Sequence, residues 1–132
     1  LKKGRISPAV ERLIECNILL SGVGFESGGL ALAHAIANGL TILPECKAMH
    51  GEAVAFGLVV QLRLERAAEL DQVLEFCQCV SLPTTLAELG LGEISDADLQ
   101  GVANAVFRNE RNMANEQAKV TKQKLVQLMC EA

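Results

Sequence analysis

The chain has 132 residues, half of them apolar, and a net charge of −4 at pH 7. It contains 12 basic residues in no basic run, and four Phe but no Tyr or Trp. It therefore lacks the positive stripe and the stacking surface that nucleic-acid-binding proteins use, and that class is excluded. The longest apolar run, VAFGLVV at 54–60, is far shorter than the ~18 residues needed to cross a bilayer.

The length suits a single domain, but the apolar content is high for a domain of this size. Part of the apolar surface is therefore expected to lie against a partner or against more of the same polypeptide. The chain begins at Leu1 rather than Met, and its end, KLVQLMCEA, carries no helix-stop signal. We expect a piece of a longer polypeptide.

The cysteines are odd in number and contain no C-x-x-C pair, which favours reduced thiols in a cytoplasmic protein. They are Cys16, Cys46, Cys77, Cys79 and Cys130.

The first predicted helix begins at Pro8, with Ser7 as its N-cap. Gly22 and Gly24 are expected to break it, so that GVGFESGG forms a flexible turn.

The second predicted helix runs from about residue 27 or 28 to Leu40, with Glu26 and Ser27 as cap residues. Its core, LALAHAIANGL, is apolar around most of its circumference, which predicts burial on several sides.

A loop containing Pro44 should follow, and the rest of the chain again favours helices. The expected segments are 50–69, 70–81, a short turn of helix before Gly90, 96–110 after the N-cap Ser95, and a last helix from near Thr121. Strand signals are weak throughout. The sequence thus predicts an all-α domain of about five to seven helices.

The only two histidines, His34 and His50, both lie in apolar stretches that flank one helix–loop–helix turn. A single buried histidine is more often a core residue, but two that face each other form half of a zinc site. A catalytic zinc site needs a third ligand and an open position. Cys46 is the local candidate for the third ligand, although a thiol in such a loop is more often only a surface residue.

The stretches LLSGVGFESGGLALAHAIANGLT and MHGEAVAFGLVVQL resemble the metal-dependent glycerol dehydrogenases, a branch of the iron-containing alcohol dehydrogenase family. A weaker similarity continues through SLPTTLAELGL and Asn112-Met113. The resemblance implies that residues 1–132 are the C-terminal all-α domain of a two-domain enzyme of the dehydroquinate-synthase-like kind. The N-terminal NAD-binding domain would lie outside this chain.

By motif position, the resemblance makes His34 and His50 the two histidine ligands of a zinc ion. The third family ligand, an aspartate, would lie upstream of Leu1, as would the glycine-rich cofactor loop. Phe25 is a candidate for the wall of the substrate pocket, and core packing is an equally good interpretation of it. The sequence departs from the family pattern HAIHNG at Ala37, where a second-shell contact or proton path would change.

The implied reaction oxidises a secondary hydroxyl of glycerol or a related polyol to a ketone, with transfer of a hydride to NAD. The chain alone is expected to be inactive, and the protein is expected to form a homo-oligomer. One alternative is a non-catalytic helical module or split-gene remnant that associates with itself through its apolar surface. Another is a self-contained zinc bundle that uses His34, His50 and Cys46. The particular polyol and the choice between zinc and iron are not specified by these residues.

Overall fold

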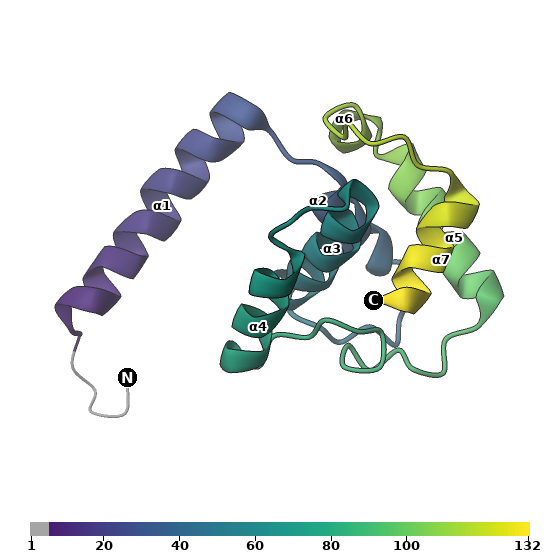
Figure 1. The fold of residues 1–132 in the computed structure, drawn as a ribbon, viewed down its shortest axis with the longest axis horizontal. Helices are drawn as coiled ribbons and strands as arrows, with labels where there is room; N and C mark the ends of the chain where they lie inside the picture. Colours follow the sequence, from purple (N-terminus) through teal and green to yellow (C-terminus); the bar gives the residue numbers. More distant parts are fainter. Residues whose placement is uncertain (1–5) are drawn as a thin grey trace.

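The computed structural model describes residues 6–132, which form seven helices and contain no strand (Figure 1). The predicted all-α class is confirmed. The helices are α1 (Pro8–Gly28), α2 (Leu32–Leu40), α3 (His50–Glu65), α4 (Leu70–Val80), α5 (Asp96–Arg108), α6 (Glu110–Met113) and α7 (Lys122–Glu131).

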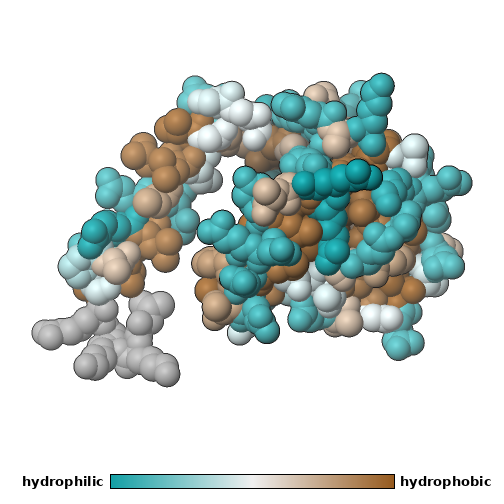
Figure 2. Space-filling view, viewed as in Figure 1, coloured by the Kyte–Doolittle hydropathy of each residue, from teal (hydrophilic) through white to brown (hydrophobic). Residues whose placement is uncertain are grey.

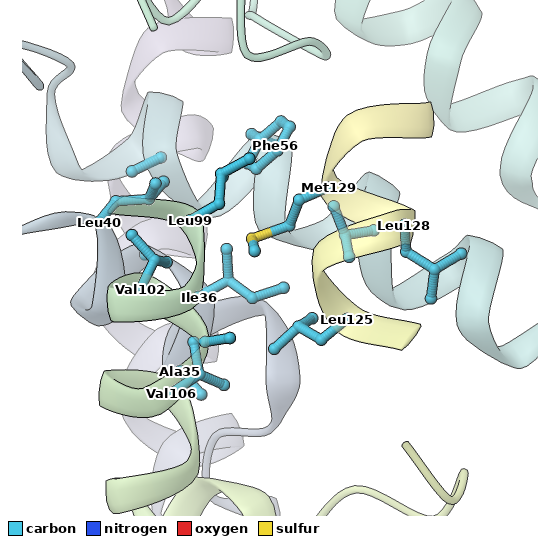
Figure 3. Packing of buried hydrophobic residues seen from close by; sticks show 14 of the residues in the cluster. Ala35, Ile36, Leu40, Phe56, Leu99, Val102, Val106, Leu125, Leu128 and Met129 are labelled. Atoms are coloured by element: carbon cyan, nitrogen blue, oxygen red, sulfur yellow. The ribbon is translucent and has the colours of Figure 1, made fainter. Parts of the chain in front are cut away.

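The hydrophobic core is built around α2, which packs against α3, α5 and α6. Helix α7 closes the core against α3 and α5. Only His34 and Asn38 of α2 are not buried, in agreement with the apolar circumference of this segment. Figure 3 shows the side chains that meet in this cluster, among them Ile36, Leu40, Phe56, Val102, Val106, Leu125 and Met129.

Two glycines allow the backbone of α2 to lie in close contact with the neighbouring helices α3 and α5. A Cβ on Gly57 of α3 would collide with the carbonyl oxygen of Ala33 and lie 3.0 Å from its carbonyl carbon. A Cβ on Gly39 of α2 would lie 2.8 Å from Val106 Cγ2 and 3.2 Å from the carbonyl oxygen of Val102 on α5. Both contacts require hydrogen in place of a side chain.

The expected break at Gly22 and Gly24 is wrong, because α1 continues through both residues to Gly28. Each glycine costs a helix about 1 kcal/mol relative to alanine, which weakens the helix without ending it. The chain turns one residue later, at Gly29, where φ is +70°. Glycine adopts such a positive φ at little cost, because it has no Cβ.

Glu26 and Ser27 are therefore not caps of the second helix, since both lie in the last turn of α1. Helix α2 starts at Leu32, with Ala31 as its N-cap, and no side chain of its own segment caps it.

Helix α1 extends away from the other helices (Figure 1). Within residues 6–132 no other helix packs against it. None of its residues is buried. Its apolar side chains form much of the hydrophobic surface in Figure 2. The Arg111 guanidinium on α6 lies 5.7 Å from the ring centroid of Phe25 on α1.

The later helices follow the predicted order with small differences at their ends. Helix α3 stops four residues early, because Arg66 adopts a left-handed conformation with φ of +54°. The turn expected before Gly90 is present but is not a regular helix. Ser95 caps α5 as predicted, and α7 begins directly after Thr121, where a start was expected. The side-chain oxygens of Ser95 and Thr121 each accept a backbone N–H of the helix that follows. The four-residue helix α6, which follows the N-cap Asn109, was not anticipated.

Among the described residues, no single helix has both the length and the apolar character to cross a bilayer; α1 and α2 pass that test only jointly, with a bend of 106° between them.

Candidate metal centre

The fold brings the two histidines together. His34 is the third residue of α2 and His50 is the first residue of α3. Their ring centroids lie 5.7 Å apart, and the ring planes are tilted by 52°. Zn–N bonds of about 2 Å in tetrahedral geometry would place the centroids of two imidazole ligands on the order of 5 Å apart. The observed spacing fits two ligands of one ion.

The environment of His34 favours its neutral form. Burial lowers the pKa of His34, and the neighbouring His50 lowers it further by charge repulsion. A histidine must be neutral at the nitrogen that binds a metal, so this shift favours ligation. Within residues 6–132 neither imidazole takes part in a hydrogen bond, which leaves the ring nitrogens of the pair available.

The start of α3 is held by an acidic side chain. The backbone N–H of Met49 donates to Glu52 Oε2 at 2.7 Å. The first turn of α3, which carries His50, is therefore capped by a side chain of the same turn. A carboxylate at this position is also favoured by the positive end of the helix dipole.

No third metal-binding side chain joins the pair within the part of the chain that the structure describes. No group of three His, Cys, Asp or Glu residues has a geometry that could hold a metal ion there. Cys46 is partly buried against the hydrophobic core. The self-contained site of His34, His50 and Cys46 therefore finds no support in the geometry.

Two further positions, Ala37 and Phe25, were singled out by the sequence. Ala37, which stands where the family pattern has histidine, is 2% exposed and belongs to the core cluster. Phe25 lies near the end of α1 and is half exposed beneath the Arg111 guanidinium. Its assignment to a pocket wall stays a prediction.

The sequence reasoning missed Gln61 on α3, whose side-chain oxygen accepts the backbone N–H of Ala33 beside His34 at 2.9 Å. The only sequence signal was the absence of a capping side chain before α2.

Comparison with known proteins gives a consistent result. The chain is 49% identical to the glycerol dehydrogenase of Thermotoga maritima over 119 residues, which are 88% of this chain and 33% of that protein. It is 48% identical to the glycerol dehydrogenase of Citrobacter freundii over 121 residues, 89% of this chain and 33% of that protein. No family model matches the chain.

Solved structures agree with the sequence comparison. The crystal structure of a probable glycerol dehydrogenase from Sinorhizobium meliloti 1021 superposes with a TM-score of 0.88 and 40% identity. The match covers 97% of this chain and 37% of that one. The chain thus has the fold of an all-α segment of these oxidoreductases. It is homologous to the glycerol dehydrogenases, as its motifs predicted, and spans about a third of the length of these relatives.

Proposed function

We propose that residues 1–132 are the C-terminal, metal-binding all-α domain of an NAD-dependent and zinc-dependent oxidoreductase like glycerol dehydrogenase. Its substrate would be the secondary hydroxyl of glycerol or a related polyol, and its product a ketone. The observation that carries the proposal is the His34–His50 pair, with ring centroids 5.7 Å apart, in a chain homologous to glycerol dehydrogenases. The five free cysteines favour a cytoplasmic location.

In this proposal, His34 and His50 hold the metal through neutral ring nitrogens and orient it from two different helices. When bound, zinc supplies Lewis acidity that lowers the pKa of a coordinated hydroxyl. The third ligand and the NAD site would come from polypeptide outside residues 1–132. The isolated chain is therefore expected to have no dehydrogenase activity.

Zinc titration by calorimetry tests the metal pair. We expect weak binding to the parent chain, because it contributes two ligands of the three that a catalytic site needs. His34→Ala and His50→Ala should each weaken binding by about tenfold or more, the scale seen when metal sites lose even outer partners. Cys46→Ser, the control, should leave the affinity unchanged.

Two results would contradict this assignment. Equal zinc affinity in the parent and both histidine variants would leave the pair as core residues. Tight stoichiometric binding that is lost in Cys46→Ser would show a complete site within the chain.

A second candidate function, self-association, is favoured by the exposed apolar surface of α1. Seven large apolar side chains of this helix are 47–74% exposed: Leu13, Ile14, Ile18, Leu19, Leu20, Val23 and Phe25. With side chains of about 150–200 Å² each, they expose roughly 600–800 Å². A stable interface of standard size buries about 800 Å² on each partner, which is of the same order as this exposed apolar area.

Light scattering after size-exclusion chromatography tests this second candidate. We expect dimers or larger assemblies of the parent chain, and monomers of the double variant Ile18→Lys with Leu20→Lys. Phe76→Lys is the matched control, because it adds the same charge at a 60% exposed apolar side chain of α4. A parent chain that is monomeric at all concentrations would exclude self-association through α1.

A further inference from the structure

Helix α2 lacks a cap of its own. Its N-cap residue is Ala31, which has no side chain to accept a backbone N–H. The first N–H groups of a helix have no partner within the helix, and a buried one needs an acceptor from elsewhere. For Ala33, which is 7% exposed, the acceptor is Gln61 Oε1 on α3 at 2.9 Å.

The carbonyl of Ala33 also lies against α3. It faces Gly57, where a Cβ would stand 3.0 Å from the Ala33 carbonyl carbon and 3.1 Å from its Cα. Gly57 and Gln61 are four residues apart and therefore lie on the same face of α3. One face of α3 thus contacts both the N–H and the carbonyl group of Ala33, the residue that precedes His34.

The orientation of the Gln61 amide is set by a third residue. Gln61 Nε2 donates to Glu65 Oε1 at 2.8 Å, again one turn further along α3. Because the amide nitrogen is engaged by the carboxylate, the amide oxygen points to the Ala33 N–H.

We propose that Gln61 and Gly57 are positioning residues for the histidine pair. They fix the backbone beside His34 against α3, the helix that also carries His50 at its start. The separation of the two rings is then set by contacts within one helix pair rather than by the loop 41–49. The role of this arrangement in metal binding rests on the proposed function, whereas its effect on the two rings does not.

The consequence for a metal is geometric. Ligand distances in a zinc site tolerate changes of only about 0.2 Å. Loss of the Gln61 acceptor leaves the Ala33 N–H without a partner and frees the first turn of α2 to shift. His34 would then move relative to His50.

The test uses the metal-free chain and NMR. The first variant is Gln61→Leu, which removes the acceptor and keeps a similar volume. We expect the amide of Ala33 to lose hydrogen-exchange protection by tenfold or more and the nuclear Overhauser effect between the His34 and His50 rings to weaken. Gln78→Leu is the matched control, because it makes the same change at an exposed position of α4; it should alter neither signal.

The rescue variant exchanges the pair, Gln61→Glu with Glu65→Gln. The carboxylate then accepts from both the Ala33 N–H and the amide at position 65, so both signals should return to the parent values. Because Glu has nearly the same shape as Gln, this exchange keeps both the packing and the acceptor, whereas Gln61→Leu keeps the volume and removes only the acceptor. In zinc calorimetry, Gln61→Leu should weaken binding by about tenfold, the range for outer-sphere partners, and the exchanged pair should restore it.

If Gln61→Leu keeps the Ala33 protection and the ring contact, the proposal is overturned. If Gln61→Leu fails to fold, Glu65→Ala decides: reduced protection of Ala33 at an unchanged melting temperature supports the proposal, and unchanged protection overturns it. If the parent chain binds no zinc but Gln61→Leu loses the ring contact, the positioning role is supported and only the metal function is contradicted.

Discussion

Phe56→Ala should lower the free energy of unfolding by about 3–5 kcal/mol, the usual cost of removing a buried ring from a core. Phe56 is fully buried in the cluster that also contains Leu99 and Met129 (Figure 3). Truncation removes apolar contacts and leaves a cavity that packed helices fill only in part. Such a loss is a large share of the 5–15 kcal/mol that stabilises an ordinary domain.

Urea unfolding followed by circular dichroism measures this loss. Phe76→Ala is the matched control, because the Phe76 ring on α4 is 60% exposed. Its effect should stay within about 0.5 kcal/mol, as for most surface substitutions. Equal losses for the two variants would mean that Phe56 does not lie in a packed core.

Gly57→Ala should lower the free energy of unfolding by about 1–3 kcal/mol, the usual cost of overpacking a core. The added Cβ would collide with the backbone carbonyl of Ala33, which cannot rotate away as a flexible side chain can. The two helices must separate to accept the methyl group. His34, next in sequence to Ala33, should move with α2, so zinc affinity should fall together with stability.

Gly51→Ala provides the control on the same helix. Nothing lies within 4 Å of the Cβ it would add, in the first turn of α3. It should stabilise the chain by up to about 1 kcal/mol, because alanine favours a helix over glycine. If both glycine variants have the same melting temperature, the close approach of α2 and α3 is not a tight contact.

Local sequence signals determined most of the helices and the candidate ligands. Ser7, Ser95 and Thr121 start their helices as predicted, because a capping oxygen acts on N–H groups two or three residues away. The two histidines were identified by their motifs, and the short connection between their segments indicated that they could meet.

The local signal for a helix break gave a wrong prediction in α1. Gly22 and Gly24 predicted a break in α1, yet the helix continues, since a glycine weakens a helix by only about 1 kcal/mol relative to alanine. Neither residue has a neighbour within 4 Å that requires it.

The sequence by itself determined the all-α class, the family motifs and the identity of the histidine pair. Only the tertiary structure decided that Gln61 caps α2, that Gly57 lets α2 and α3 touch, and that α1 stands free of the core. The physical reason is distance along the chain. A cap supplied 28 residues away, or a contact between two backbones, depends on how helices pack, and no local pattern of residues encodes it.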